Sequence, residues 1–263
     1  MKKFLVIGNP IEHSLSPQLH NYWIERNSID AIYEKQKLNE DELEKIISKI
    51  KDKIIDGVNV TVPFKKKIIP YLDTLSAEAQ NTQSVNTIYL KDNKVVGHNT
   101  DIIGFETSIK KSEYNINNKE VLILGAGGVV HSIIFALIKM KVSKIKICNR
   151  TKEKAENLKK LYNNIEIVEW GEVSNFDMII NATSLGLNEK DEINLNYSSI
   201  HKNKLFYDVI YNPKETEFLR NGKNLGNITI NGKLMFVYQA FLAFNIWHEQ
   251  KPDINEEVLK LLD

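Results

Sequence analysis

Residues 120–140 read EVLILGAGGVVHSIIFALIKM, and this stretch decides the fold class of the second half of the chain. A buried-strand run, Glu120–Leu124, is followed at once by Gly125-Ala126-Gly127-Gly128 and then by an apolar helical pattern over 129–140. Glycines between a strand and a helix allow a tight turn, and they let backbone N–H groups approach a pyrophosphate at the helix N-terminus. The stretch therefore predicts a Rossmann-type, dinucleotide-binding unit. By itself the motif is weak, because an ordinary strand-to-helix turn can look similar.

The residues after the next expected strand, Lys144–Cys148, indicate which dinucleotide is bound. Asn149-Arg150-Thr151 begins 24 residues after Gly125, close to the ribose-contacting position expected about 20 residues on. An acidic residue there would bind the 2′-hydroxyl of NAD, whereas a guanidinium, an amide and a hydroxyl suit a 2′-phosphate. The sequence favours NADP (NADPH) as cofactor. In the alternative interpretation Arg150 is a solvated charge and Thr151 caps the following helix, a role compatible with phosphate binding.

Short apolar runs alternate with helical patterns nearly throughout the chain, which is typical of α/β proteins with parallel sheets. Upstream of residue 101, strands are expected over 4–8, 31–38 and 57–62, and Asp92-Asn93 predicts a hairpin between 87–90 and 95–98. Ser16 is the expected N-cap of a helix that reaches about residue 27, with Pro17 at its first position. Because the pattern restarts near residue 101, we predict two α/β domains, the second with a doubly wound parallel sheet.

Composition excludes several classes of protein. The 263 residues carry 35 Lys and Arg against 34 Asp and Glu, and this near-zero net charge gives no support for binding to nucleic acid or to a membrane surface. The single cysteine, Cys148, excludes an intrachain disulfide and fits a reducing compartment. No apolar run approaches the roughly 18 residues of a membrane span. We expect a cytoplasmic protein whose partner is a small molecule.

Polar clusters stand at the predicted strand ends of the first domain, where open α/β sheets bind ligands. They are Ser14-Leu15-Ser16, residues 59–65 (Asn-Val-Thr-Val-Pro-Phe-Lys), Asn86-Thr87 and Asn99-Thr100-Asp101. Alternation along a strand places Asn59 and Thr61 on one face. Hydroxyls, amides, one lysine and one aspartate suit a small polyhydroxylated carboxylate. No metal is expected, because His13 and His20 match no zinc spacing.

These motifs, taken together, resemble the shikimate dehydrogenase family. The resemblance rests on residues 8–17, 59–65, 98–101, 125–128, 149–151, 181–186, 207–213 and 239–240, which follow the family's order over essentially the whole chain. It implies a substrate-binding domain of residues 1–101 plus 234–263 and an NADP-binding domain of residues 102–233. It also implies an oxidoreductase that reversibly reduces 3-dehydroshikimate to shikimate with NADPH, in aromatic amino-acid biosynthesis.

The resemblance also implies site residues. It assigns catalysis to Lys65 and Asp101, and substrate contacts to Ser14, Ser16, Asn59, Thr61, Lys65, Asn86, Asp101, Tyr211 and Gln239. The expected cofactor contacts are Gly125, Ala126, Gly127, Gly128, Val129, Asn149, Arg150, Thr151, Thr183, Ser184, Ile210 and Gly232. Ser14, Ser16 and Tyr211 would hold the substrate carboxylate, while Asn86, Asp101 and Gln239 would bind the ring hydroxyls. The assembly would be a monomer or a homodimer.

Chemistry supports the assignment of Lys65. Reducing a ketone with NADPH needs a proton for the developing alkoxide, and a lysine can deliver it and stabilise the oxyanion while charged. Against this, Lys65 opens the run Lys65-Lys66-Lys67, which in isolation is typical of a solvated surface. The chain departs from the family at Val129-Val130-His131-Ser132, where small residues and then Arg are usual, and at Gln83-Ser84-Val85.

Two other functions stay open from the sequence. One is a quinate/shikimate dehydrogenase with broader substrate or cofactor use, since substrate breadth is not written in these motifs. The other is a non-catalytic NADP-binding sensor that kept the fold, because function must be argued from the site and not from the fold. The presence of both Lys65 and Asp101 favours the enzyme.

Overall fold

The computed structural model describes residues 1–172, 175–188 and 191–263. The chain forms two compact units, residues 1–104 with 237–263 and residues 105–236. The divisions fall inside helices α4 (Asp101–Lys111) and α8 (Lys233–His248), three residues beyond each predicted boundary. What each unit binds stays a prediction.

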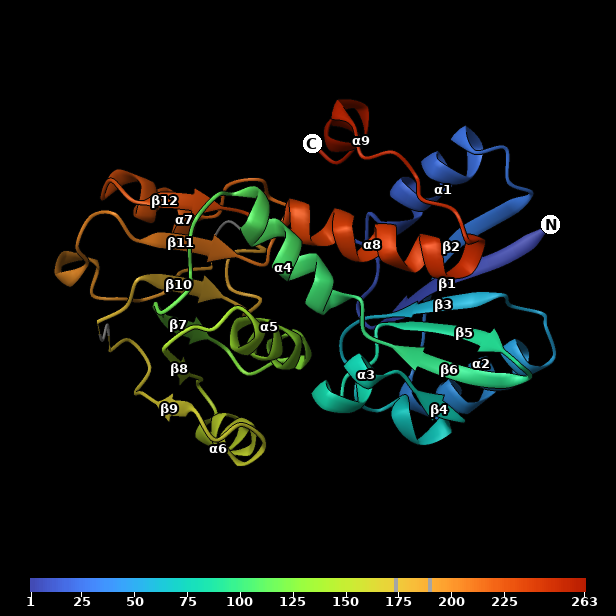
Figure 1. The fold of residues 1–263 in the computed structure, drawn as a ribbon, viewed down its shortest axis with the longest axis horizontal. Helices are drawn as coiled ribbons and strands as arrows, with labels where there is room; N and C mark the ends of the chain where they lie inside the picture. Colours follow the sequence, from blue (N-terminus) through green and yellow to red (C-terminus); the bar gives the residue numbers. More distant parts are fainter. Residues whose placement is uncertain (173–174, 189–190) are drawn as a thin grey trace. The chain divides into compact units, whose positions relative to one another are not determined.

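The first unit contains a mixed six-stranded sheet in the order β2-β1-β3-β5-β6-β4 (Figure 1). Strands β2, β1 and β3 are parallel, whereas β5 runs antiparallel to both β3 and β6. Asp92 and Asn93 have positive φ angles in the turn that joins β5 to β6, so the predicted hairpin is confirmed. The strands are β1 (Lys2–Gly8), β2 (Ala31–Lys37), β3 (Gly57–Val60), β4 (Thr74–Leu75), β5 (Thr87–Lys91) and β6 (Lys94–His98).

Helices accompany this sheet. They are α1 (Ser16–Arg26), α2 (Leu43–Lys51), α3 (Ala77–Thr82), the C-terminal part of α8 and α9 (Glu256–Leu261), with 3-10 turns at Glu40–Glu42 and Ile69–Tyr71. The side chains of β1 point alternately to the two faces of the sheet. Leu5 and Ile7 pack into one core with the apolar face of α2, while the Phe4 ring lies on the other face with its centroid 4.9 Å from that of Trp247 on α8. Both faces of the sheet are therefore covered.

The second unit contains a fully parallel sheet in the order β12-β11-β10-β7-β8-β9, which Figure 1 labels strand by strand. This order is that of the doubly wound dinucleotide-binding fold, with its switch point between β7 and β10. The prediction of a Rossmann-type sheet is confirmed. The strands are β7 (Glu120–Leu124), β8 (Lys144–Cys148), β9 (Ile165–Ile167), β10 (Met178–Asn181), β11 (Leu205–Asp208) and β12 (Ile228–Ile230).

The unit's helices are α5 (Gly128–Lys139), α6 (Lys152–Leu161) and α7 (Glu217–Asn224), with a 3-10 turn at Tyr197–Ser199. Helices α3 and α7 were not predicted, and they are only 6 and 8 residues long. Helices of about two turns give the helical period little room to repeat. Side-chain caps on Ser76 and Thr216 start these helices, and such caps were the signal that could have found them.

Candidate active site

The two residues predicted to be catalytic form an ion pair in the first unit. Lys65 Nζ donates to Asp101 Oδ2 at 2.5 Å, and the two side chains are 11% and 7% exposed. Lys65 lies in the loop after β3, where its carbonyl accepts from the Val85 N–H (2.8 Å). Asp101 begins α4, and its N–H donates to Asn99 Oδ1 (3.0 Å). The interpretation of Lys65 as a solvated surface charge is therefore wrong.

Asn86 joins this pair to α8. Its Oδ1 accepts from the backbone N–H of Thr100 (2.7 Å), and since a backbone N–H can only donate, the orientation of the amide is fixed. The amide nitrogen consequently donates to Asp101 Oδ1 (2.9 Å) and, at 3.4 Å, to Gln239 Oε1. Lys65, Asp101, Asn86 and Gln239 thus form one connected polar cluster at the edge of the first sheet.

Asn59 lies in β3 and Thr61 lies just after it, at the carboxyl end of the strand. Asn59 Nδ2 donates to the Asn86 carbonyl (3.0 Å) and to Thr87 Oγ1 (3.1 Å), which links Asn59 to the cluster. Thr61 lies one residue beyond β3, which ends two residues earlier than expected, and its N–H still donates to the carbonyl of Ile7 (2.9 Å). A Cβ at Gly8 would come within 2.5 Å of Thr61 Cγ2, which explains the glycine in this motif.

Ser14 and Ser16 lie at the start of α1, but the predicted cap is wrong. Ser16 is the first residue of the helix, the N-cap is Leu15, and no side chain makes a capping bond from that position. Ser14 Oγ instead accepts from the Ser16 N–H (3.3 Å). The helix begins one residue earlier than predicted, because the Leu19 N–H donates to the Leu15 carbonyl (3.1 Å) and Ser16 is already inside the first turn.

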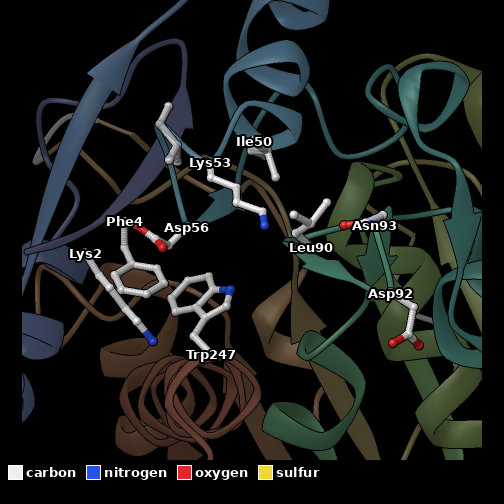
Figure 2. Close-up of a pocket in the computed structure, with 10 residues that line it drawn as sticks. Lys2, Phe4, Ile50, Lys53, Asp56, Leu90, Asp92, Asn93 and Trp247 are labelled. Carbon is white, nitrogen blue, oxygen red and sulfur yellow. The ribbon is translucent and has the colours of Figure 1, made fainter.

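A hollow in the first unit lies at the other end of its sheet. A cavity of about 430 Å³ is lined by the start of β1, the end of α2 and the β5–β6 turn, and Figure 2 shows Lys53 and Trp247 beside it. Parallel α/β sheets bind ligands beyond the carboxyl ends of their strands, and this hollow is at the amino end of β1. It shares no residue with the cluster around Lys65.

In the second unit, the glycine loop has the geometry that a dinucleotide needs. Gly125 has φ of +108°, and a Cβ there would lie 2.9 Å from the Ala182 carbonyl oxygen, across the switch point. Gly127 is the N-cap of α5, and no side chain caps the helix. A Cβ added at Gly127 would meet no atom within 4 Å, so the space beside this residue is open. Ala126, Gly128 and Val129 are half-buried around it. A phosphate can approach the backbone closely here, which fits the expected pyrophosphate.

Past β8, the residues expected to select NADP are accessible. Asn149 Nδ2 donates to the Thr151 carbonyl (2.7 Å), which tightens the loop. Arg150 and Thr151 are exposed, and Thr151 occupies the N-cap position of α6 without a side-chain capping bond. The Thr151 hydroxyl therefore does not serve as a cap. These groups fit a 2′-phosphate, because an exposed guanidinium can form paired hydrogen bonds to phosphate oxygens.

Thr183, Ser184, Ile210 and Gly232 are also in the second unit. Thr183 Oγ1 donates to Asn181 Oδ1 (2.7 Å), Ser184 is exposed and Ile210 is buried. A Cβ at Gly232 would lie 2.1 Å from the Val209 carbonyl oxygen, so packing alone requires this glycine. Tyr211 belongs to this unit as well, and its ring stacks on that of Phe236 with centroids 4.4 Å apart.

Asp208 organises these loops and was not found from the sequence. Its carboxylate accepts from Thr216 Oγ1 (2.6 Å), the Ile210 N–H (2.9 Å) and Asn181 Nδ2 (3.1 Å). Burial raises the pKa of Asp208 to about 6, and the hydrogen bonds oppose that rise. A charged residue at the end of an apolar strand was the signal available in the sequence, since a buried carboxylate needs hydrogen-bond donors.

Several residues outside the predicted site have plain structural roles. His20 is buried in the core, and burial lowers its pKa to about 3. Burial raises the pKa of the Cys148 thiol to about 12, so it is not a reactive thiolate. Among the residues that the structure describes, no three His, Cys, Asp or Glu side chains are placed to hold a metal ion. Likewise, none of the helices in that part of the chain combines the length and the apolar character that spanning a membrane requires.

Comparison with known proteins identifies the family of the chain. Residues 6–88 match the model of the shikimate dehydrogenase substrate-binding domain, and residues 107–221 match that of shikimate/quinate 5-dehydrogenase. The NADP(+) shikimate dehydrogenase of Pelagibacter ubique (strain HTCC1062) is 60% identical over 262 residues, which cover 100% of this chain and 99% of that protein.

Solved structures of family members are similar to this chain over its full length. The shikimate dehydrogenase of Aquifex aeolicus is 36% identical with a TM-score of 0.91, covering 100% of this chain and 97% of that one. The shikimate 5-dehydrogenase of Thermus thermophilus, solved with NADP(H) and shikimate, is 29% identical with a TM-score of 0.91, covering 100% and 98%. The chain belongs to the shikimate dehydrogenase family.

Proposed function

We propose that the chain catalyses the reversible, NADP-dependent reduction of 3-dehydroshikimate to shikimate, a step of aromatic amino-acid biosynthesis. The observation that carries this proposal is the buried pair of Lys65 and Asp101, bonded through Asn86 to Gln239. A family member that had lost catalysis would have no need to keep a lysine and a carboxylate buried together, because the desolvation of two buried charges costs free energy even when they form an ion pair. The geometry therefore supports an enzyme over a sensor.

The substrate is proposed to bind at the carboxyl edge of the first sheet. Its ring hydroxyls would meet Asn86, Asp101, Gln239, Asn59 and Thr61. Its carboxylate would meet the hydroxyls of Ser14 and Ser16 at the start of α1, together with Tyr211. The α1 N-terminus adds a favourable dipole there, since Ser16 and Pro17 open the helix without a side-chain cap.

NADPH is proposed to bind the second unit. Gly125, Ala126, Gly127, Gly128 and Val129 would hold its pyrophosphate at the start of α5. The 2′-phosphate would lie against Asn149, Arg150 and Thr151. Thr183, Ser184, Ile210 and Gly232 would contact the nicotinamide end. When bound, the cofactor supplies the hydride for the ketone carbon.

The chain's own chemistry is then a proton transfer. Lys65 Nζ donates a proton to the developing alkoxide in the direction of reduction, and takes it from the hydroxyl in the direction of oxidation. Asp101 Oδ2 holds the ammonium in position, and Asn86 holds Asp101 through its other oxygen. A fixed ammonium stabilises negative charge at the oxygen as it forms, without reorganisation at the moment of reaction.

The proposed place of action is the cytoplasm, which fits the buried free thiol of Cys148. The proposed assembly is a monomer or a homodimer. Sedimentation of the purified chain distinguishes these two states.

The experiment that tests the function follows absorbance of the reduced nicotinamide. Shikimate or quinate is combined with NADP or NAD in all four pairings. The proposal predicts fast reduction with shikimate and NADP and slow reduction in the other three. Comparable turnover of quinate or of NAD would assign the chain to the broader quinate/shikimate dehydrogenases, and no turnover in any pairing would leave the NADP-binding sensor.

A further inference from the structure

Tyr33 is the buried residue behind the proposed substrate site that no assigned role explains. It lies in β2 and is 1% exposed. Its backbone is held to α1 on both sides, because its N–H donates to Asn21 Oδ1 (2.9 Å) and its carbonyl accepts from Asn21 Nδ2 (2.8 Å). Its ring stacks on His20 with centroids 4.2 Å apart and planes 2° from parallel. The position of the phenol is therefore fixed by α1.

The hydroxyl of Tyr33 meets Asn59 Oδ1 at 2.6 Å. The direction of this bond follows from the other half of the Asn59 amide. Its Nδ2 donates to the backbone carbonyl of Asn86 (3.0 Å), a group that can only accept, and to Thr87 Oγ1 (3.1 Å). Both N–H protons of Asn59 are thus used inside the protein, and Oδ1 must be the atom that faces Tyr33. The Tyr33 hydroxyl is the donor.

We propose that Tyr33 is a positioning residue for the substrate site, which holds Asn59 so that it meets the substrate as a hydrogen-bond acceptor. A carbonyl oxygen has two lone pairs, and Tyr33 occupies one of them. The second lone pair of Asn59 Oδ1 is the one that can accept a hydrogen bond from a ligand. The ligand group that Asn59 recognises is therefore a hydrogen-bond donor, such as a hydroxyl of a polyhydroxylated ring. The inference rests on the proposed function, because it assumes that Asn59 contacts that substrate.

The test is a double-mutant cycle of Tyr33→Phe and Asn59→Ala, with shikimate and NADP as substrates. Tyr33→Phe removes the hydroxyl that donates to Asn59 Oδ1 and leaves this buried acceptor without its donor. We expect the contact of Asn59 with the substrate to weaken enough to lower kcat/KM for shikimate about tenfold. The KM for NADP stays unchanged. In the Asn59→Ala background, Tyr33→Phe should change kcat/KM less than about twofold, because its effect passes through the missing amide. Tyr22→Phe is the matched control, since it removes an exposed tyrosine hydroxyl bonded to Glu257.

A general structural role would give a different pattern. A lower denaturation midpoint with unchanged kcat/KM for shikimate, or equal effects of Tyr33→Phe in both backgrounds, would overturn the inference. A wild-type chain that does not turn over shikimate would overturn the proposed function, and the inference with it.

A second measurement needs no variant and so does not depend on folding. In wild-type protein labelled at asparagine, addition of shikimate should leave the Asn59 side-chain amide protons slow to exchange, because both already donate inside the protein. Loss of that protection on binding would contradict the proposal.

Discussion

In the first unit the centre of the proposed site is a set of buried side chains bonded to one another, whereas in the second unit several of the proposed cofactor-binding residues are exposed to solvent. Asn86, Asp101 and Asn59 are 3%, 5% and 6% exposed, and Asn86 bonds to both of the others. In the second unit Gly127, Arg150 and Ser184 are all exposed. A buried network holds its groups in one geometry, while an exposed loop contributes backbone and charge. We infer that the first unit performs the chemistry and the second determines cofactor affinity and choice.

Lys65→Ala breaks this division most strongly. Loss of the proton donor should lower kcat by about 10² to 10⁴-fold, with the Kd for NADP unchanged. Steady-state kinetics and NADP titration measure the two quantities. Lys66→Ala is the matched control, because Lys66 is the exposed neighbour in the same run. Near-normal turnover of Lys65→Ala would contradict the proposed role.

Arg150→Ala tests the other side of the comparison. A hydrogen bond to a charged group contributes about 1.5–3 kcal/mol, so the KM for NADP should rise by about 10- to 100-fold while kcat at saturating NADP stays close to wild type. Turnover with NAD should change little, because NAD lacks the 2′-phosphate. The wild-type preference for NADP should also weaken at high salt. An equal loss with NADP and NAD would show that Arg150 does not read the phosphate.

Lowering the pH should reduce the stability of the first unit and increase that of the second. Burial lowers the pKa of His20 to about 3 and that of His248 to about 4, both in the first unit. Since the unfolded chain takes up these protons near pH 6.5, the first unit loses stability as pH falls below that value, by about 2 kcal/mol per histidine between pH 7 and 5. The pKa of Asp208 in the second unit is raised to about 6, so the second unit recovers stability as pH falls through 6.

Hydrogen exchange, corrected for intrinsic rates, reports this difference on peptides from β1 and β3 against peptides from β10 and β11. His20→Leu should reduce the acid sensitivity of the first unit, whereas His13→Asn, at an exposed histidine, should leave it unchanged. Equal acid sensitivity of the two units would mean that these buried groups do not control it.

Substitution of two glycines in the same loop should affect two different quantities, the stability of the second unit and the KM for NADP. Gly125→Ala places a side chain at positive φ and against the Ala182 carbonyl, so it should destabilise the second unit by about 1–2 kcal/mol. Gly127→Ala meets nothing within 4 Å, so it should leave the denaturation midpoint unchanged while raising the KM for NADP about tenfold. A Gly127→Ala variant with wild-type KM would mean that no phosphate approaches there.

Local patterns in the sequence account for much of this structure, and long-range bonds account for the rest. The glycine loop after Glu120–Leu124 predicted the second sheet, because a strand, a turn and a helix are adjacent in the chain. The partners of Lys65 were predicted from the family resemblance alone, since Asp101 lies 36 residues further on. No feature of the sequence predicted the hydrogen bond from Tyr33 to Asn59, because a tyrosine in a strand is an ordinary core residue. The cap predicted at Ser16 is wrong because the helix begins one residue earlier, with the Leu19 N–H donating to the Leu15 carbonyl.

The most direct test of this division of roles measures the Kd for NADP and the kcat at saturating NADP in Lys65→Ala, Arg150→Ala and the double variant. The account predicts wild-type Kd in Lys65→Ala, near wild-type kcat in Arg150→Ala, and in the double variant the two losses combined without interaction. A weakened Kd in Lys65→Ala, or a collapsed kcat in Arg150→Ala with NADP saturating, would contradict it.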